Sequence, residues 1–461
     1  MNAPDPRPPR GFPAEADARH AYDEADLARA LNVYKFFYPT VSGAAIIKGN
    51  EAVGLVANRV FGIMDSNPAQ IGFTLNSDTP YGPALLDLSI GPLVIELPPG
   101  PLIVCSIDVN QRWVADMGLP GPDAGKGGKH LLVPPAFEGT LPAAGYHLHW
   151  ASSNRQIVGI RSLPVQGNVP EAKQRLHTVK VYPLNPKTPW SEPTWLDITD
   201  QEQDATPIRY EDRFQYWEVL KETLDAEPPF AGYHAAYGEL AMLGIEKGRP
   251  FTPDARMQAL LERAAQQGIA QMRAQSFADR RPERIVWPGR QWEWAALRFE
   301  DGDFNTAYYV DTSAREKWFY QAIGASPAMF RRDPQAGSLY WLGLRDRSGA
   351  YLEGGKHYQL KVPLPVPGKL FWSVTVYDAA TRSQIRTPQG KAALRSLQEL
   401  SQLGDAQSVD LFFGPSEPAG QTGRWIQTTP GHGWFVYFRI YGPQAPAFDG
   451  SWKPGDFEPL G

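Results

Sequence analysis

Side chains suited to acid–base chemistry stand close together in residues 76–82. Asn76, Asp78 and Tyr81 are separated by only one or two residues, and the Pro and Gly beside them are typical of a turn that presents side chains. An aspartate there can act as base or nucleophile, a tyrosine as acid or orienting group, and an asparagine as donor to a developing oxyanion. We therefore predict Asp78 and Tyr81 as catalytic residues, and Asn76 and Thr79 as substrate-binding residues.

The same segment also has a structural interpretation. Asn76 and Asp78 can cap the turn through side-chain hydrogen bonds to its backbone while Tyr81 packs beneath it. A catalytic site needs these side chains beside a second titratable group in a concave pocket, whereas a structural turn has them bonded to its own backbone.

A second carboxylate would extend this chemistry to hydrolysis. Paired carboxylates serve as acid and base in glycosyl or ester cleavage, and their separation decides which mechanism is open. Asp108 lies in the apolar segment Leu102–Val109, and we predict it as the third catalytic residue, paired with Asp78. Asp378 is the alternative partner.

Tyr377, Asp378, Arg382 and Arg439 form a second group of candidates. Tyr377 and Asp378 end an apolar segment, Arg382 follows it, and Arg439 lies in a later aromatic-rich segment. A carboxylate and a guanidinium at strand ends can bind a polar ligand bidentately, so we predict these four as substrate-binding residues. An Asp–Arg pair more often holds a β-turn, and that alternative stays open.

His147 and His149 alternate on a predicted strand and would therefore face the same side, as in two-histidine metal sites. The sequence places no third ligand near them, and His130 is isolated, so no metal site is predicted. The loop Gly125–Lys129 lacks the Ser or Thr of a phosphate-binding loop, and no Gly-x-Ser-x-Gly segment occurs. The cofactor is thus unknown, without a nucleotide signature.

The composition indicates an ordinary soluble globular protein and excludes several functions. The net charge is -5 and the basic residues are scattered, which argues against nucleic acid as a partner. The single cysteine, Cys105, excludes an internal disulfide and a multi-cysteine metal site. No segment has the roughly 18 consecutive apolar residues of a membrane span, and the start lacks a signal-peptide core. We expect a cytoplasmic protein, or a periplasmic one if an export signal has been removed.

The elements that must position these residues begin with a leader and helices. Residues 1–22 are predicted as a disordered leader, its Pro-rich part ending near residue 14, and a helix is predicted from Glu15 to Asn32. Residues 34–64 have mostly helical spacing, which the glycines at 43, 49 and 54 interrupt. Short apolar or alternating segments then predict strands at Leu93–Leu97, Leu102–Val109, His130–Val133, Gly145–Trp150, Gln156–Ile160 and Val179–Tyr182.

Residues 190–284 have the three- and four-residue spacing of helices and are predicted as a helical connector, with one helix starting at Thr252-Pro253. Strands return at Ser338–Leu344, His357–Val362, Leu370–Tyr377, Val409–Phe413 and Trp434–Tyr441. The predicted fold is therefore mainly β with a helical segment, as two jelly-roll-like sandwiches in tandem, at 23–189 and 285–461.

Short motifs along the chain carry a resemblance to a known family. In the first half they are Asn76-x-Asp78-Thr79-x-Tyr81, Leu86-Asp87-Leu88 with Gly91-Pro92, Asp108, and Val158-Gly159-Ile160-Arg161. In the second half they are Gly248-Arg249-Pro250-Phe251, Tyr351-Leu352-Glu353-Gly354, the segment Phe371–Asp378 with Thr381-Arg382-Ser383, and Arg439-Ile440-Tyr441. In this order they resemble a bacterial family built from two paired domains of unknown function, numbered 1254 and 1214.

This resemblance implies a tandem of sandwiches related in shape to some capsid proteins and glycan-cleaving enzymes, but it implies no activity. The chain departs from the family pattern at Leu75 and Pro80, and at Thr422–Ile426 with Thr428. If these positions line a pocket, we expect its ligand to differ from those of relatives.

Our first functional hypothesis is a hydrolase acting on a small polar or glycosidic substrate at a cleft between the sandwiches, with Asp78 and Tyr81 as leading residues. The second is a non-catalytic ligand-binding or assembly protein in which the turn at 76–82 is structural. In both cases we expect a homo-oligomer that assembles through sandwich faces or edges.

Overall fold

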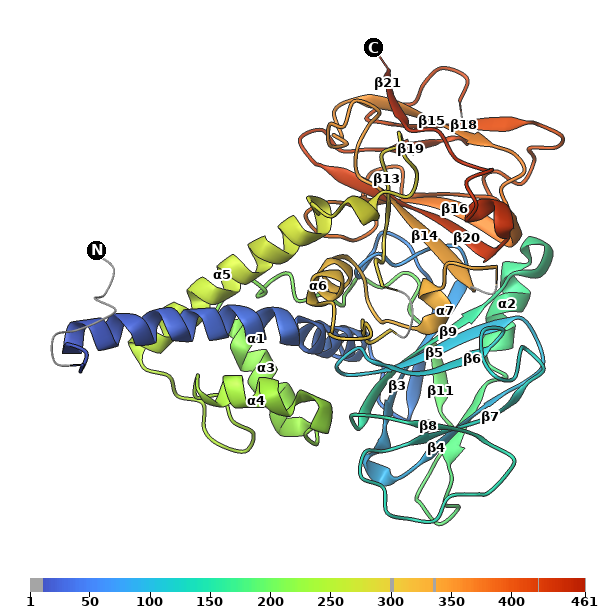
Figure 1. Cartoon of the computed structure of the whole chain (residues 1–461). Coiled ribbons are helices and arrows are strands. Elements are labelled where there is room, and N and C mark those ends of the chain that lie inside the picture. Colours follow the sequence, from blue (N-terminus) through green and yellow to red (C-terminus); the bar gives the residue numbers. More distant parts are fainter. Residues whose placement is uncertain (1–10, 299–301, 335–336, 422, 461) are drawn as a thin grey trace.

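Two β-sandwiches lie one above the other, with helices between and beside them (Figure 1). The computed structural model describes residues 11–298, 302–334, 337–421 and 423–460. Helices α1 (Glu15–Ala52), α3 (Gln215–Ala226), α4 (His234–Ala241) and α5 (Ala255–Phe277) extend to one side of both sandwiches. The prediction of a mainly β fold with tandem sandwiches and a helical segment is confirmed.

The N-terminal sandwich consists of a six-stranded and a four-stranded sheet. The larger sheet has the order β11 (Thr194–Asp197), β1 (Val60–Asp65), β3 (Pro80–Asp87), β9 (Arg155–Ser162), β5 (Leu102–Asp108) and β6 (Trp113–Gly118). The smaller sheet has the order β10 (Lys180–Pro183), β4 (Leu93–Leu97), β7 (Gly128–Val133) and β8 (His147–Trp150). Helix α2 (Val169–Leu176) packs against β3 and β9, after the short 3-10 turn η2 (Val165–Gly167). A 3-10 turn, η1 (Leu88–Ile90), joins β3 to β4.

The six strands predicted in this half are β4, β5, β7, β8, β9 and β10, each within a few residues of its predicted bounds. Strand β11 lies inside the predicted helical connector and pairs in parallel with β1, from Val60 opposite Thr194. The connector therefore begins with a strand of the first sandwich, because backbone pairing with β1 outweighs the weak local pattern.

The C-terminal sandwich is built in the same way from a five-stranded and a four-stranded sheet. The larger sheet has the order β13 (Trp292–Trp294), β14 (Ser338–Gly343), β20 (Trp434–Pro443), β16 (Gly368–Asp378) and β17 (Ala393–Arg395). The smaller has β19 (Trp425–Gln427), β18 (Ser408–Gly414), β15 (His357–Pro363) and β21 (Phe457–Leu460). The five strands predicted here are β14, β15, β16, β18 and β20. A further sheet has two strands, β2 (Gln70–Ile71) and β12 (Gln203–Asp204). A 3-10 turn, η5 (Ala445–Ala447), follows β20.

Helix α1 corrects two expectations. It runs unbroken from Glu15, so the part of the predicted leader from that residue on is helical, while residues 1–10 lie outside the described part. Gly43 and Gly49 do not interrupt it: an added Cβ would lie 2.0 Å from the Val109 carbonyl oxygen at Gly43, and 2.4 Å from that of Asp204 at Gly49. These glycines therefore let the helix approach the backbone of neighbouring segments.

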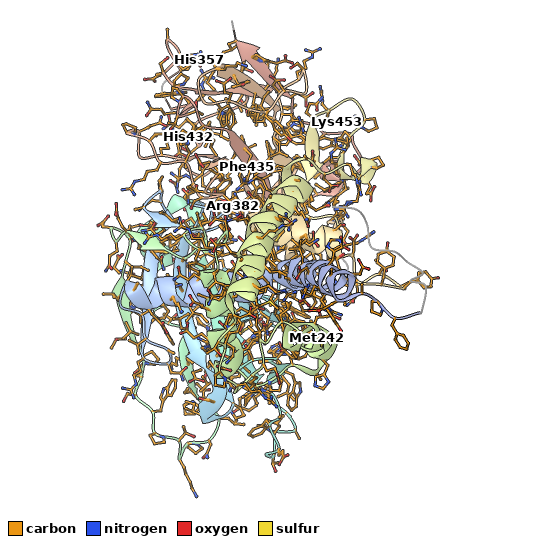
Figure 2. All side chains as sticks on the ribbon, turned by 90° about the vertical axis from the view of Figure 1, so that its left-hand side faces the viewer. Met242, His357, Arg382, His432, Phe435 and Lys453 are labelled. Carbon is orange, nitrogen blue, oxygen red and sulfur yellow. The ribbon has the colours of Figure 1, made fainter. Side chains whose placement is uncertain are left out.

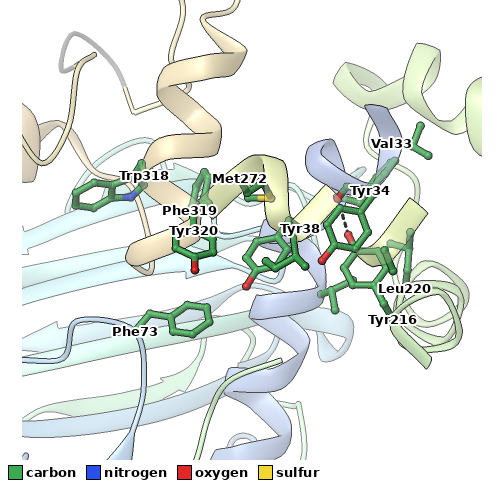
Figure 3. Packing of buried hydrophobic residues seen from close by; sticks show 14 of the residues in the cluster. Val33, Tyr34, Tyr38, Phe73, Tyr216, Leu220, Met272, Trp318, Phe319 and Tyr320 are labelled. Atoms are coloured by element: carbon green, nitrogen blue, oxygen red, sulfur yellow. Dashed lines mark hydrogen bonds between the residues drawn. The ribbon is translucent and has the colours of Figure 1, made fainter. Parts of the chain in front are cut away.

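The helices share a core with aromatic side chains from α1 and α3 (Figure 3). The Tyr216 hydroxyl donates a 2.6 Å hydrogen bond to the backbone oxygen of Tyr34, and the two rings are 4.1 Å apart. Asp254 caps α5 by accepting from the Met257 amide, just after the predicted start. The remaining helical elements are η3 (Ala231–Tyr233), η4 (Pro282–Arg284), α6 (Thr312–Gln321) and α7 (Pro327–Phe330). Helices α6 and α7 lie in a region predicted as sandwich, and α6 packs on α1 and α5 instead.

Strand alternation determines what each larger sheet presents outside its own sandwich. On β9, Val158 and Ile160 enter the N-terminal core, so Ile157, Gly159 and Arg161 face the other way. The outer face of this sheet and the outer face of the five-stranded sheet both border one cavity between the sandwiches.

In the described ranges no helix combines the length and the hydropathy that a bilayer crossing requires.

Candidate functional site

A cavity of about 930 Å³ lies between the two sandwiches. Its floor is the outer face of the six-stranded sheet, with Tyr81 on β3, Ile157, Gly159 and Arg161 on β9, Ile103, Cys105 and Ile107 on β5, and Asp116 on β6. The segment containing α6 and α7 covers it, and β14 and β20 close one end with Tyr340, Tyr437, Arg439 and Tyr441. Most of the other lining side chains are apolar, whereas polar groups gather where β9 meets β20.

Arg161 is the central side chain of this polar end. Its Nε donates to Thr79 Oγ1 at 3.1 Å and its Nη2 donates to the Tyr441 hydroxyl at 3.0 Å. The guanidinium also lies against the rings of Tyr81 and Tyr441, with its carbon 5.2 and 5.0 Å from their centroids. Among the described residues, Nη1 has no hydrogen-bond partner and no carboxylate lies within 4.0 Å of the group. Arg161 is thus a cation held in one orientation, with one N–H donor unused. The residue ends the sequence motif Val158–Arg161, but we did not select it as a candidate site residue.

Asp78 lies behind this arginine, buried at 3% exposure. Its Oδ2 accepts from Ser373 Oγ at 3.0 Å and from the Tyr441 hydroxyl at 3.2 Å, which joins the N-terminal turn to two strands of the other sandwich. Its Oδ1 is buried and has no hydrogen-bond partner among the described residues. Asn76 completes the group: its Nδ2 donates to Tyr441, and its Oδ1 accepts from the amide of Asp78.

Arg439 is the second cation at this end of the cavity. Its Nη1 donates to the Tyr377 hydroxyl and its Nη2 to the Thr74 carbonyl oxygen, both at 2.7 Å. Burial lowers its pKa, but the surrounding phenols, Tyr377 and Tyr441 first, and Asp78 outweigh burial and raise it. Arg439 therefore stays charged.

Tyr81 lies on strand β3, one residue after its start, and not in the turn that the sequence suggested. Burial raises the pKa of its phenol, although Arg161 and Arg439 act in the opposite direction. Burial likewise raises the pKa of Tyr441. Both phenols are therefore neutral at physiological pH and can serve as hydrogen-bonding groups.

Asp108 lies apart from this group. It ends β5, but its carboxylate faces the following turn, where Oδ1 accepts from the amides of Asn110 and Arg112 and Oδ2 accepts from Ser152 Oγ. The side chain is fully buried and does not line the cavity. Burial raises its pKa to about 6, even though the Ser152 hydrogen bond lowers it. The structure therefore brings Asn76, Asp78, Thr79 and Tyr81 together and leaves Asp108 out.

Asp378 and Arg382 also lie off the cavity. The Arg382 amide donates to the Asp378 carbonyl oxygen, but the two side chains bind other partners. Asp378 Oδ1 accepts from the amides of Ala380 and Thr381, and its Oδ2 lies 2.8 Å from His432 Nδ1. Figure 2 places Arg382 near the junction of the C-terminal sandwich with the rest of the molecule. There both carboxylate oxygens of Glu211 accept from its Nη2, at 2.7 and 2.9 Å. Asp378 thus holds a turn, and Arg382 is committed to a buried ion pair.

The structure adds His130, which the sequence left isolated, to the predicted pair of His147 and His149. Strands β7 and β8 pair in parallel with His130 opposite His147, and His130 Nδ1 lies 3.2 Å from His149 Nε2. His130 Nε2 lies 3.2 Å from Asp123 Oδ1, and His149 reaches the cavity. No group of three or more His, Cys, Asp or Glu side chains in the described ranges is arranged to hold a metal ion. Only the strand register, which the sequence does not determine, could have revealed this cluster.

Asp116 is a further carboxylate on the floor of the cavity, and no sequence pattern led us to select it. It lies on β6 opposite Cys105 of β5, and it is 8% exposed. Burial raises its pKa to about 6, against the lowering effect of the neighbouring Ser326 hydroxyl and of the hydrogen bond from the Ala328 amide. The pKa of the Cys105 thiol is raised as well, first by burial and then by Asp116, so the thiol is protonated and a poor nucleophile.

The site meets one test of a functional pocket and one test of a structural turn. Asn76 and Tyr81 line a concave cavity beside two arginines, as expected of a binding or catalytic site. Asn76 also accepts from the amide of Asp78 within its own turn, as a cap does. The turn is therefore capped and at the same time presents side chains to the cavity.

Comparisons with known families find a match in each half of the chain. Residues 60–183 match the family described as "Protein of unknown function (DUF1254)", and residues 337–445 match "Protein of unknown function (DUF1214)". Among curated proteins, nothing matches this chain.

Two of the solved structures that match align over nearly the whole chain. The crystal structure of the VPA0106 protein from Vibrio parahaemolyticus matches with a TM-score of 0.57 and 15% identity, over 95% of this chain and 100% of that one. An uncharacterized protein from Burkholderia cenocepacia matches with a TM-score of 0.38 and 13% identity, over 96% of this chain and 97% of that one. The first likeness extends over both sandwiches, so it shows a shared fold and no shared activity. With its DUF1254 domain first and its DUF1214 domain second, the chain belongs to the family of proteins that pair these two domains of unknown function.

Proposed function

We propose that this protein binds a small organic anion in the cavity between its sandwiches, with Arg161 as the main anchor. The observation that carries the proposal is the state of that guanidinium. Two of its nitrogens are held by Thr79 and Tyr441, the third is unused, and no carboxylate among the described residues neutralises it. A guanidinium fixed in this way binds carboxylate or phosphate groups at a small loss of conformational entropy.

The charge balance of the polar end supports an anionic ligand. Arg161 and Arg439 line this end and contribute two positive charges, whereas Asp78, the carboxylate that acts on Arg439, is buried behind the lining. The neutral phenols of Tyr81 and Tyr441 add hydrogen-bonding groups without adding charge. A net positive, partly buried end of a cavity attracts an anion more strongly than a water-exposed arginine would.

The rest of the cavity favours an apolar body on that anion. Isoleucines 103, 107 and 157 line its floor, and Trp318 and Met329 line its cover. Its volume of about 930 Å³ is in the range of sites that enclose most of a small organic molecule. In this proposal Asn76 and Thr79 act as positioning residues, because they hold Arg161 and Tyr441, and Tyr377 does the same for Arg439.

Calorimetric titration of the purified full chain tests the proposal. The probes are benzoate, phenyl phosphate and decanoate, each compared with a neutral counterpart, namely benzyl alcohol for the first two and decanol for the third. We expect anions to bind at least about tenfold more tightly than the neutral compounds, and Arg161→Gln to remove the difference. Arg175→Gln is the matched control, because Arg175 binds Ser162 and Leu163 outside the cavity. Equal binding of anions and neutral compounds, or an unchanged preference in Arg161→Gln, would overturn the proposal.

Hydrolysis of such a ligand is the second candidate function, and Asp78 favours it. Its Oδ1 is buried without a partner, while Tyr441 and Ser373 fix Oδ2, so the carboxylate is held in one orientation with one acceptor unused. In this candidate Asp78 acts as base and Tyr81 as acid or orienting group, as predicted from the sequence.

Nitrophenyl esters and nitrophenyl glycosides that carry a carboxylate test this candidate. Asp78→Asn preserves the acceptor for Ser373 and Tyr441, and we expect it to lower kcat about a hundredfold. Asp108→Asn tests the other predicted carboxylate, which does not line the cavity. Hydrolysis that persists in Asp78→Asn at the original rate would overturn the role of Asp78.

The homo-oligomer expected from the sequence stays a prediction. Light scattering of the purified full chain measures its mass directly, and a mass of one chain, 51.1 kDa, would contradict it.

A further inference from the structure

The cavity has a second polar end, at Asp116. This carboxylate lies on the floor, more than nine-tenths buried, and its Oδ2 accepts from the Ala328 amide at a long 3.4 Å. No Lys, Arg or His nitrogen of the described residues lies within 4.0 Å of its oxygens. A buried carboxylate without a cation is unfavourable in the empty protein, which gives it a reason to accept a hydrogen bond from a ligand.

The strand register gives the spacing between the two polar ends. Arg161 on β9 pairs with Ile103 on β5, and Cys105, two residues further, pairs with Asp116 on β6. Arg161 and Asp116 are therefore two strands apart and offset by two residues, which places their Cα atoms about 12 Å apart. A single small group such as acetate cannot contact both.

Between these ends the floor carries Cys105 on β5 and, paired with it on β9, Gly159. A Cβ added there would meet no atom within 4 Å, so it would point into open space. The residue lies within the extended strand β9, and its backbone does not require glycine. Its effect is to leave a bare stretch of floor, bordered by Ile103 and Ile157, along which an apolar chain can lie.

From this layout we propose the class of ligand, in an inference that rests on the proposed function. The ligand is elongated and bifunctional: its anionic group binds Arg161, its apolar body crosses Gly159, and a hydrogen-bond donor at its far end, such as a hydroxyl group, binds Asp116. A long-chain ω-hydroxy carboxylate has this chemistry. Asp116 is then a specificity residue, since it selects among anions that Arg161 would all accept.

Titration of the full chain with decanoate and 10-hydroxydecanoate tests the inference. Because the hydroxyl group would donate a hydrogen bond to a charged acceptor, we expect the hydroxy acid to bind at least about tenfold more tightly. Asp116→Leu should abolish this preference while decanoate still binds. Asp116→Asn, which keeps a carbonyl acceptor, should retain part of it.

Gly159→Leu tests the path between the ends. Its side chain would fill the bare floor, and we expect both ligands to lose most of their affinity while the Tm is preserved. Gly238→Leu is the matched control, because Gly238 also has open space and ordinary backbone angles but lies on α4, away from the cavity. Unchanged binding in Gly159→Leu would overturn the proposed path.

The outcomes separate this inference from the proposed function. Equal affinity for decanoate and 10-hydroxydecanoate would overturn the role of Asp116 while anion binding stands. Binding of benzoate or phenyl phosphate without either decanoate would overturn the elongated ligand alone. If no anion of either set binds, both proposals are wrong.

Discussion

The hydroxyl of Tyr441 donates a hydrogen bond to Asp78 Oδ2, 3.2 Å away, across 363 residues of sequence. The Tyr441 hydroxyl oxygen also accepts hydrogen bonds from Asn76 and from Arg161. One phenol on β20 therefore holds together the polar groups that the N-terminal sandwich contributes to the cavity. The site is incomplete in either sandwich alone, which gives the pairing of the two domains in one chain a physical reason.

Tyr441→Phe should destabilise the protein, because it leaves the buried groups of Asp78 and Asn76 with fewer partners. We expect a loss of about 1 to 3 kcal/mol in the free energy of unfolding, measured by urea titration. Tyr437→Phe, on the same strand, is the control: the Tyr437 hydroxyl is buried without a partner among the described residues, so its removal should change little. Equal losses in the two variants would contradict a specific role for the Tyr441 hydroxyl.

Much of the fold could be predicted from the sequence because both sandwiches alternate clearly between apolar and polar positions. Strand β4 was predicted at its observed bounds, Leu93–Leu97, and the strands of the C-terminal core were located within a few residues. Strand β11 was not predicted, since its four residues form a strand only through pairing with β1. The length of α1 was underestimated, because its glycines were interpreted as breaks and not as close contacts.

The candidate site was only partly predictable. Asn76, Asp78 and Tyr81 were selected because local spacing concentrates polar groups in one segment. Asn76 and Tyr81 do line the cavity, and Asp78 is buried behind them, bound to Asn76 through its backbone amide. Arg161, Asp116 and Gly159 lie on strands whose residues look ordinary in sequence. Their importance comes from which face of the sheet borders the cavity, and that depends on the packing of one sandwich against the other.

Asp116→Asn should stabilise the empty protein at neutral pH. Burial raises the pKa of Asp116 from 3.8 to about 6, so the folded state binds its proton more tightly than the unfolded chain does. The stabilisation that comes from binding this proton is fully present below about pH 4 and is lost as the pH rises through about 6. One pKa unit corresponds to about 1.4 kcal/mol, so the variant should gain at most about 3 kcal/mol at pH 8 and almost nothing at pH 4.

Thermal unfolding of both proteins from pH 4 to pH 8 measures this difference. Cys105, Ser326 and the Ala328 amide are the groups packed on Asp116, and none of them carries a positive charge. We therefore expect Asp116→Asn to become more stable relative to the original chain as the pH rises. A variant that is less stable than the original chain at pH 8 would show that the carboxylate is satisfied in the empty protein.

The histidine cluster should make the protein less stable as the pH falls. The pKa of His149 is lowered from 6.5 to about 4, first by burial and then by His130 and His147. The pKa of His130 is also lowered to about 4, first by burial, although Asp123 acts in the opposite direction. The unfolded chain takes up protons at these positions below about pH 6.5 that the folded protein does not bind until about pH 4, so stability decreases across this window.

His149→Gln tests whether the histidine cluster causes this loss of stability at low pH. The variant loses one of the two shifted groups, and we expect the decrease in Tm between pH 6.5 and pH 4.5 to be smaller than in the original chain. His234→Gln is the control, because His234 makes none of the contacts of the cluster. The cluster is not the source if both variants keep the original pH profile.

Arg382 and Glu211 should act on stability as a pair. Arg382 is fully buried, bound to both carboxylate oxygens of Glu211, and enclosed by the rings of Phe73 and Tyr320 at 4.4 and 4.3 Å. Glu211→Gln would leave a buried guanidinium without its counter-ion, and we expect the free energy of unfolding to decrease by about 3 to 5 kcal/mol.

The double variant, Arg382→Met with Glu211→Leu, removes both charges, and a double-mutant cycle with the single variants measures the coupling. We expect the double variant to be more stable than Glu211→Gln, because no unpaired charge remains buried. Anion binding supplies the second readout: since Arg382 does not line the cavity, the folded double variant should bind decanoate with unchanged affinity. A loss of binding in a stably folded double variant would instead support the ligand-binding role that the sequence suggested for Arg382.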